Sequence, residues 1–382
     1  MKLFDVYPLF EITPVRAEGS WLWDDQGVKY LDMYGGHAVI SIGHAHARYI
    51  SRLEEQLRKI GFYSNSVQNP LQEQFAEKLG SLSGYPDYHL FLCNSGAEAN
   101  ENALKLASFV TGRKKIIAFQ KAFHGRTSGA VAATDNPGIV SEFNKGHQVV
   151  FLPLNDGAAL LHALDDDVAA VIIEGIQGVG GIHIPDQAFL QLLAARCSTN
   201  GALLILDEIQ SGYGRTGKFF AHQYAGIKPD LITIAKGMGN GFPVGGVLIH
   251  PNIKPWHGML GTTFGGNHLA CAAGLAVLEV MEEENLMRNA NRVGNYLTDE
   301  LNRISGVAEV RGQGLMIGFD LPAELSGIRQ ALLNTHRIFT GEAKPNTIRL
   351  LPSLALSRAE AEIFTAALQA CLATFMTNET KP

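Results

Sequence analysis

Residues 231–249 read LITIAKGMGNGFPVGGVLI, two apolar runs joined by a loop that holds one lysine and a cluster of glycines. Lys236 directly follows the first run, at the end of a predicted buried strand. Four of the nine residues from 237 to 245 are glycine, so the backbone can pass close to a bulky group there. Most lysines are simply solvated, but these surroundings predict a functional role for this one.

Similar apolar runs precede this segment, with helical stretches between them. The expected strands are residues 88–94, 114–120, 147–154, 168–176, 202–209, 231–236 and 244–249, and the expected helices include 95–110 and 188–201. Runs of Ile, Val and Leu without polar alternation indicate strands that are buried on both faces, in a mostly parallel sheet covered by helices. Ligands bind such sheets at the carboxyl ends of the strands.

A smaller α/β unit is predicted after Asn267. Its expected elements are a long helical stretch over 268–304, a hairpin over 307–321, a helix over 327–339, a strand over 347–353 and a helix over 358–376. Residues 20–33 are expected to form a further hairpin that joins it. We therefore expect residues 1–45 and 271–382 to form a small domain, and residues 46–270 to form a large domain.

Composition and charge exclude several classes of protein. The 382 residues suffice for two domains, and 46% of them are hydrophobic and 18% charged. The net charge of -6 gives no basic field, so we expect no nucleic-acid partner. No run reaches the roughly 18 apolar residues of a membrane span, and no secretory signal is visible. The four cysteines lie far apart, so we expect no metal site, no disulfide framework and a cytoplasmic location.

The residues at the first two strand ends suit a phosphate and a ring. Ser95, Gly96 and Ala97 open a helix, where free N–H groups and the helix dipole favour an anion. The alternative is an ordinary N-cap, in which Ser95 and Glu98 form a capping box. After the second strand, in AFHGRTSGA (122–130), an aromatic residue could stack on a flat ring and Arg126 could bind a carboxylate, although an ordinary surface loop is the alternative.

Two later strands end in acids, Glu174 in one and the Asp207–Glu208 pair in the other. Neighbouring strand residues point to opposite faces, so this pair is expected to divide its roles, one lining the site and the other solvated or bonded to backbone. That alternation argues against a paired-carboxylate hydrolase. Residues 212–218 match GxxxxGK, but Phe219 replaces the Ser or Thr of a nucleotide-binding loop, which argues against an NTPase.

One ligand would satisfy all of these positions. A phosphate suits residues 95–97, a flat ring suits Phe123, a protonated ring nitrogen suits Asp207, and an aldehyde suits Lys236. Pyridoxal phosphate has each of these parts. Burial would disfavour the ammonium form of the lysine, which suits it to imine exchange and proton transfer.

Five motifs, in this order, resemble those of the class III aminotransferases that use pyridoxal phosphate, and in particular the acetylornithine/ornithine branch. They are SGAEANENALKLA (95–107), FHGRT (123–127), LLILDEIQSGYGRTG (203–217), IAKGMGNGFPVGG (234–246) and GTTFGGNHLACAAG (261–274). The resemblance runs from about residue 10 to the last helix. It implies the fold type I of pyridoxal-phosphate enzymes, with a mostly parallel seven-stranded sheet and a smaller α/β domain, in a homodimer with shared active sites.

The resemblance also implies roles for individual residues. The implied cofactor residues are Lys236 as the Schiff-base lysine and general base and acid, Asp207 at the ring nitrogen, Gln210 near the ring hydroxyl, Phe123 on the ring face, Ser95, Gly96 and Ala97 at the phosphate, and Thr263 with Thr262 at the partner subunit's phosphate. The implied substrate residues are Arg126 and Arg349, which would bind carboxylates, with Glu174 and His37 lining the substrate region. His37 could bind a substrate carboxylate or be a structural histidine.

The chain departs from the family at 174–181, EGIQGVGG, where Val179 replaces a usual glutamate. In ornithine-type enzymes that glutamate neutralises the second arginine, so Arg349 would lack that partner here. An unpaired, partly buried arginine is costly. We therefore expect an amino donor with an anionic or strongly polar distal group, such as N-succinylornithine; another acid beside Arg349, or a solvated Arg349, is the alternative.

The function implied by the resemblance is the transfer of the δ-amino group of an N-acylornithine, acetylated or succinylated, to 2-oxoglutarate, giving glutamate, in arginine biosynthesis. The alternatives are another ω-aminotransferase, acting on ornithine or 4-aminobutyrate, and glutamate-1-semialdehyde aminomutase. From other classes, a catalytically silent cofactor-binding protein and, more distantly, a dehydrogenase are alternatives. A silent protein would be expected to have lost Lys236, which is present.

Overall fold

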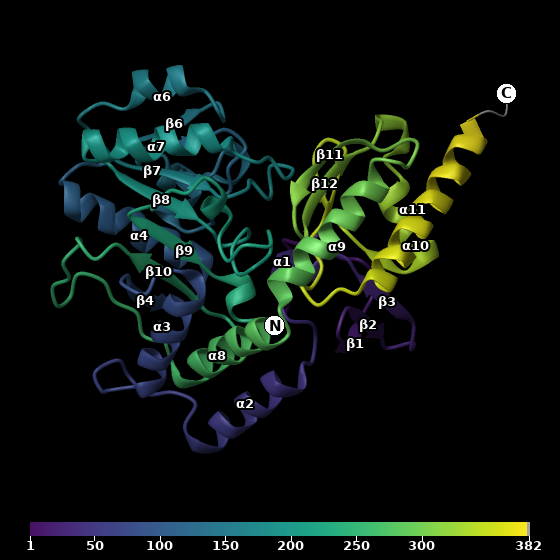
Figure 1. Ribbon diagram of the computed structural model, residues 1–382, viewed down its shortest axis with the longest axis horizontal. Coiled ribbons are helices and arrows are strands. Elements are labelled where there is room, and N and C mark those ends of the chain that lie inside the picture. The colour runs from purple at the N-terminus through teal and green to yellow at the C-terminus, as the bar shows by residue number, and fades with distance from the viewer. Residues whose placement is uncertain (380–382) are drawn as a thin grey trace.

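The computed structural model of the chain describes residues 1–379 and is built around a seven-stranded sheet (Figure 1). In spatial order the strands are β4 (His89–Cys93), β10 (Gly245–Ile249), β9 (Leu231–Ile234), β8 (Leu203–Asp207), β7 (Val168–Glu174), β5 (Lys115–Phe119) and β6 (Val149–Leu152). Strand β10 is antiparallel to both of its neighbours, and all pairs from β9 to β6 are parallel. The predicted α/β fold with a mostly parallel seven-stranded sheet is confirmed.

Helices cover both faces of this sheet, which explains why its strands show no polar alternation. Successive residues of β8 alternate between two cores: Leu203 and Ile205 pack on the side of α4 (Gly96–Thr111), and Leu204 and Leu206 pack on the side of α7 (Gln187–Asn200). Two shorter helices complete this part, α5 (Ser128–Ala132) against α4 and α6 (Gly157–Ala163) against α7. Every strand predicted for the sheet is present.

Two four-stranded sheets lie beside the large one (Figure 1). Their strands, in spatial order, are β1 (Pro14–Glu18), β2 (Trp21–Asp24), β3 (Lys29–Asp32) and β13 (Ile338–Phe339) in one, and β11 (Ala308–Gln313), β12 (Met316–Asp320), β15 (Thr347–Leu350) and β14 (Gly341–Ala343) in the other. The predicted hairpins β2–β3 and β11–β12 are confirmed. Because β13 pairs with β3, segments from both ends of the chain share one sheet. The domain boundaries at residues 45 and 270 stay a prediction.

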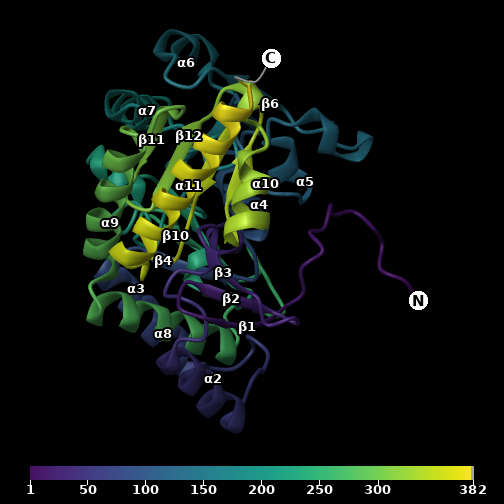
Figure 2. The ribbon, with the colours of Figure 1, turned by 90° about the vertical axis from the view of Figure 1, so that its right-hand side faces the viewer.

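The remaining helices join and cover these sheets (Figure 2). They are α2 (Ala47–Lys59), α3 (Pro70–Ser83), α8 (His268–Glu283), α9 (Leu286–Leu301), α10 (Ile328–His336) and α11 (Arg358–Glu379), with the short turns α1 (Gly35–Ala38), η1 (Pro137–Ile139), η2 (Glu142–Asn144), η3 (Ala221–Tyr224), η4 (Lys236–Met238) and η5 (Ala323–Leu325). Helix α8 packs against α2 and α3, and α11 packs against α9 and α10. No helix within residues 1–379 is long and apolar enough to cross a membrane.

The helical stretch predicted over 268–304 consists of two helices, α8 and α9, which are separated at Asn285, whose φ of 53° lies in the left-handed region that asparagine tolerates. One predicted helix is wrong in extent. The helix predicted over 327–339 ends at His336, because Arg337 has a φ of 59° and the next two residues form β13. The four cysteines are free and buried.

Candidate active site

A cavity of about 370 Å³ lies where the strands β7, β8 and β9 end. The lining residues that the sequence had singled out are Ser95, Gly96, Ala97, Phe123, Arg126, Glu174, Asp207, Gln210 and Lys236. The structure thus brings together residues from the ends of five strands of the sheet, β4, β5, β7, β8 and β9. Four predicted residues, His37, Thr262, Thr263 and Arg349, are not part of this lining.

Lys236 follows β9 directly and has a φ of 48°, in the left-handed region that is strained for a residue with a side chain. Burial lowers the pKa of its amine, while the nearby carboxylates of Asp207 and Glu174 oppose this shift. The neutral amine, which is the nucleophilic form, is therefore more accessible than in a solvated lysine. Gly245 of the same segment has no room for a side chain, since a Cβ there would lie 2.6 Å from the carbonyl oxygen of Ser95.

Asp207 ends β8 and is only 4% exposed. Its Oδ2 accepts from Nδ1 of His124 at 2.7 Å and from Nδ2 of Asn100 at 2.8 Å, and its Oδ1 accepts from the backbone N–H of Ile209 at 3.0 Å. Thr233 in turn donates to Oδ1 of Asn100 at 2.7 Å. The carboxylate is therefore fixed in orientation by donors from three separate segments.

Sequence reasoning assigned no role to His124 and Asn100. His124 stood in the FHGRT motif beside Phe123, and that position was the only available signal. Its ring is buried, and its Nε2 has no hydrogen-bond partner among residues 1–379. Asn100 lies one turn into α4, where nothing in the sequence distinguishes it from an ordinary helical asparagine.

Glu208 points away from the cavity, which confirms the predicted division of roles between the neighbouring acids. Its Oε1 accepts from Nδ1 of His222 at 2.7 Å and from the backbone of the same residue at 2.9 Å. Its Oε2 accepts from Ser211 at 2.6 Å and from the N–H of Ala221 at 3.1 Å. The second acid was expected to be either solvated or bonded to backbone, and Glu208 is bonded to backbone. It helps to hold the loop that follows β8.

The anion end of the cavity is the start of α4. The Ser95 hydroxyl caps this helix by accepting from the N–H of Glu98 at 3.1 Å. The expected capping box is only half formed, because Glu98 reaches the N–H of Asn94 at 2.9 Å and not that of Ser95. At Gly96 a Cβ would lie 2.9 Å from the Ile209 side chain, so a larger residue here would displace that side chain.

Glu174 connects the two walls of the cavity. Its Oε1 accepts from the N–H of Phe123 and its Oε2 accepts from the N–H of Gly178, both at 3.0 Å. Burial raises the pKa of this carboxyl to about 7, although nearby His124 acts in the opposite direction. Gly178 also accepts, through its carbonyl oxygen, from Nη1 of Arg349 at 3.0 Å. Glu174 therefore positions both the aromatic wall and the turn at Gly178 that bonds to Arg349.

Arg349, on β15, is 4% exposed and lies behind this wall. Besides Gly178 it donates to the carbonyl oxygen of Glu342 at 2.8 Å and to the Tyr34 hydroxyl at 3.4 Å. Within residues 1–379 no carboxylate forms an ion pair with it. Val179 is 42% exposed and lines the cavity.

The two predicted threonines lie outside this cavity. The Thr262 hydroxyl accepts from Nδ2 of Asn94 at 3.3 Å and from the N–H of Gly265 at 3.1 Å, and the residue lines a separate hollow. Thr263 is exposed on the surface. His37 is also exposed, and its carbonyl oxygen accepts from Nε2 of Gln210 at 3.2 Å.

These residues fit pyridoxal phosphate. Oε1 of Gln210 is buried and has no partner in the part of the chain that the structure describes, so it is available to a ligand hydroxyl. Three groups surround the same space. The fixed carboxylate of Asp207 suits a ring nitrogen, the Lys236 amine of lowered pKa suits an aldehyde, and the helix start at residues 95–97 suits a phosphate.

Comparison with known proteins gives a consistent result. The family model of the class-III aminotransferases matches residues 5–372. Acetylornithine aminotransferase from Nitrosomonas europaea is 38% identical over 99% of each chain, and that from Bacillus subtilis is 41% identical over 94% of each. Among solved structures, ornithine aminotransferase from Toxoplasma gondii superposes with a TM-score of 0.91 at 27% identity, covering 99% of this chain and 93% of that one. Acetylornithine aminotransferase from Elizabethkingia anophelis does so with a TM-score of 0.84 at 30% identity, covering 97% and 96%.

Proposed function

The chain belongs to the class-III aminotransferases, and from this premise we propose that it transfers the δ-amino group of an N-acylornithine to 2-oxoglutarate. The reaction would yield an N-acylglutamate semialdehyde and glutamate, a step of arginine biosynthesis. Curated relatives named acetylornithine aminotransferase, at 38% to 42% identity, support this choice of donor. The observation that carries the chemistry is the position of Lys236 and Asp207 in one cavity.

The enzyme is dependent on pyridoxal phosphate, as are the other members of its family. When bound, this group supplies an aldehyde that condenses with amines and a protonated ring that withdraws electrons from the neighbouring carbon. We assign Lys236 to the aldehyde and Asp207 to the ring nitrogen. Ser95, Gly96 and Ala97 would bind the phosphate, Phe123 would pack on the ring face, and Gln210 would bond to the ring hydroxyl.

The protein's own contribution to the reaction is proton transfer and orientation. We propose that the Lys236 amine removes a proton from the carbon that bears the transferred nitrogen and returns it to the carbon on the other side of that nitrogen, a 1,3-proton shift that its lowered pKa favours. Asp207, held by His124 and Asn100, keeps a fixed carboxylate beside the ring. Arg126, which lines the cavity, would bind one substrate carboxylate.

Arg349 would bind a second carboxylate, and its surroundings bear on the nature of the donor. Among the described residues, only neutral oxygens bond to it, and the Val179 side chain carries no charge. An anionic ligand would compensate a buried guanidinium. This supports a donor with an anionic or strongly polar distal group, for which N-succinylornithine is the specific candidate. Glu174 would hold Gly178 in place, whose carbonyl oxygen accepts a hydrogen bond from Arg349.

We further propose a homodimer in which Thr262 and Thr263 bind the phosphate of the partner subunit's cofactor. Exposed Thr263, together with the position of both threonines outside the subunit's own cavity, supports this arrangement. A cytoplasmic setting is also proposed, and its support is the four free cysteines.

A substrate panel on the purified holoenzyme tests the proposal. We expect N-acetylornithine or N-succinylornithine to give the highest kcat/KM. One glutamate should form from 2-oxoglutarate for each donor molecule consumed. Ornithine as the best donor would contradict the N-acyl assignment, and turnover without 2-oxoglutarate would indicate an aminomutase instead.

A further inference from the structure

The turn that carries Lys236, residues 236–240, has a left-handed backbone at both of its ends. Lys236 opens this lysine turn with a φ of 48°, and Asn240 closes it with a φ of 47°. The left-handed region is tolerated by asparagine but is unfavourable for lysine. A strained conformation of this kind persists only where the surrounding structure holds it.

The hydrogen bonds within the lysine turn do not fix it relative to the cavity. The N–H of Gly239 donates to the carbonyl oxygen of Lys236 at 3.0 Å, and the N–H of Met238 donates to that of Ala235 at 3.1 Å. Both bonds join neighbours along the chain. The position of the turn must therefore be set by contacts with other segments.

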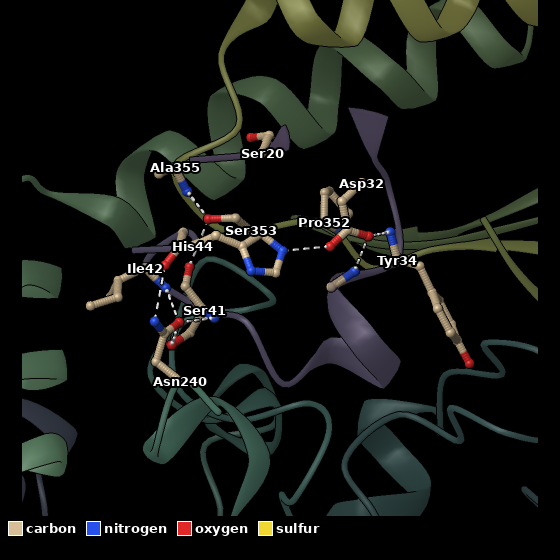
Figure 3. A network of polar contacts seen from close by, with 12 residues as sticks. Ser20, Asp32, Tyr34, Ser41, Ile42, His44, Asn240, Pro352, Ser353 and Ala355 are labelled. Carbon is tan, nitrogen blue, oxygen red and sulfur yellow. Dashed lines mark hydrogen bonds and ion pairs between the residues drawn. The ribbon is translucent and has the colours of Figure 1, made fainter. Parts of the chain in front are cut away.

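A segment far earlier in the chain supplies these contacts. Figure 3 shows the Asn240 side chain facing Ser41 and Ile42, whose N–H groups donate to its Oδ1 at 2.8 Å and 3.1 Å. Nδ2 of Asn240 donates to the carbonyl oxygen of Gly43 at 2.9 Å. In the other direction, the Ser41 hydroxyl donates to the carbonyl oxygen of Gly237 at 2.7 Å. The lysine turn and residues 41–43 are thus bonded to each other from both sides.

Burial protects these bonds from competition by water. Ser41 is 1% exposed and Asn240 is 6% exposed. Neither residue is part of the lining of the cavity, whereas Lys236 is. Any effect that Ser41 and Asn240 have on the cavity therefore passes through the backbone that they hold.

Ser41 is itself held from the opposite side, by the segment that follows β15 (Figure 3). Its carbonyl oxygen accepts from the N–H of Leu354 at 2.8 Å and from the Ser353 hydroxyl at 3.1 Å. Both backbone polar groups of Ser41 are thus bonded, its N–H to Asn240 and its carbonyl oxygen to residues 353 and 354. Ser41 is therefore a fixed support for the lysine turn.

We propose that Ser41 and Asn240 are positioning residues for the catalytic lysine: their hydrogen bonds hold Lys236 in its left-handed conformation and thereby keep its amine in place for the aldehyde of pyridoxal phosphate. This inference rests on the proposed function. Without these bonds the strain at Lys236 relaxes, and the direction of its Cα–Cβ bond changes with the backbone. The long side chain passes this change on to the amine, and misplacing a reacting group by about 1 Å can lower a rate about 10²-fold.

The test compares how fast the loaded protein releases two forms of the cofactor. Pyridoxal phosphate and pyridoxamine phosphate present the same phosphate and ring, but only the first has an aldehyde that Lys236 can bind covalently. Ser41→Ala should release pyridoxal phosphate about five- to tenfold faster than the wild type, the effect of one hydrogen bond. Its release of pyridoxamine phosphate should be unchanged.

Two further variants locate the effect. Ser353→Ala is the matched control, because Ser353 is 2% exposed and bonds to Ser41 but not to the lysine turn. Leu354 still holds Ser41 in this variant, so both release rates should equal those of the wild type. Asn240→Gly keeps the left-handed φ at no steric cost and removes the carboxamide, so it should release pyridoxal phosphate faster than Ser41→Ala does. If Asn240→Gly does not fold, Ser41→Ala decides.

Two outcomes of the release experiment would overturn the inference. One is a Ser41→Ala variant that behaves like Ser353→Ala. The other is a Ser41→Ala variant that releases both cofactor forms faster by the same factor, because that indicates general damage to the cavity.

Steady-state kinetics of the holoenzyme give an independent readout. In Ser41→Ala, kcat should fall about five- to tenfold while KM for the donor stays unchanged, because the residues that bind substrate are not altered. A raised KM with unchanged kcat would also count against the inference. A wild type that is inactive on every N-acylornithine would contradict the proposed function instead. The release rates involve no donor, so they would still decide the role of Ser41 and Asn240.

Discussion

The carboxylate of Asp207 accepts hydrogen bonds from His124, Asn100 and the backbone of Ile209. Asp207→Asn would keep the shape of the side chain but remove its charge and one acceptor. We expect cofactor binding to persist and kcat to fall about 10²–10³-fold, the range for loss of one preorganised electrostatic group. Steady-state kinetics with absorbance of the bound cofactor tests this, and an unchanged kcat would contradict the role.

In the part of the chain that the structure describes, Lys236 is the one amine that lines the cavity. Lys236→Ala should abolish the visible absorbance of the enzyme-bound aldehyde at neutral pH and lower turnover by about 10²–10⁴-fold, as expected for a lost general base. Borohydride treatment should attach the cofactor to the wild type and not to the variant. Near-normal turnover in Lys236→Ala would remove the basis of the mechanism.

Glu174 predicts a specific dependence of stability on pH. Burial raises its pKa from the ordinary 4.5 to about 7, so the folded chain binds this proton more tightly than the unfolded chain. The stabilisation is complete below the unfolded value and is lost as pH rises through about 7. Relative to Glu174→Gln, the wild type should therefore lose about 1–3 kcal/mol of unfolding free energy between pH 5 and pH 8.

Urea unfolding of the cofactor-free proteins at both pH values measures this difference. The same comparison with Glu309→Gln, an exposed acid on β11, should show no such loss. A wild type and a Glu174→Gln variant with parallel pH dependence would contradict the raised pKa.

The sequence located some site residues and missed others for a physical reason. Lys236 and Asp207 directly follow buried apolar runs, and parallel topology brings such strand ends together. His124 and Asn100 touch Asp207 only because a loop and a helix converge on it. Tyr34 acquires its place from contacts with β15, more than three hundred residues later, and no local pattern encodes such a contact.

At the level of elements, apolar runs predicted every strand of the large sheet, because burial on both faces leaves a long, unbroken hydrophobic signal. The two-residue strand β13 gives no such signal and exists through its pairing with β3. The break between α8 and α9 was missed for another reason. Asn285 adopts the left-handed conformation at little cost, and the hydrophobic pattern continues on both sides of it.

Asn285 allows a test of that break. Its φ of 53° is costly for alanine and comfortable for glycine, and the residue is exposed. Asn285→Ala should destabilise the protein by about 1 kcal/mol and Asn285→Gly should be close to neutral. Asn302→Ala is the matched control, because that exposed residue has a right-handed φ of -66°. Thermal unfolding measures the differences, and equal effects at the two positions would indicate that conformational strain is not the cause.

At the scale of the molecule, exposed apolar groups gather next to the loop that holds Thr262 and Thr263. Phe62 and Phe264 are 43% and 58% exposed and contact each other with ring centroids 5.3 Å apart. The N-terminal segment extends away from the rest of the subunit and exposes Leu3, Phe4 and Leu9 (Figure 2). Exposed apolar clusters of this kind mark protein interfaces, which supports the proposed dimer.

Phe264→Glu tests whether this surface closes the active site. A buried, unpaired carboxylate would weaken the proposed interface, so the variant should sediment with the mass of one chain where the wild type sediments with that of two. Its turnover should fall in proportion to the fraction of dimer, because Thr262 and Thr263 would no longer reach the partner's cofactor. A higher protein concentration should restore part of the dimer and part of the turnover. Ile363→Glu places the same charge on an equally apolar but distant position of α11, 47% exposed, and should remain dimeric and active. A wild type that is active as a single chain would show that each cavity is complete by itself, and the threonines would then need another role.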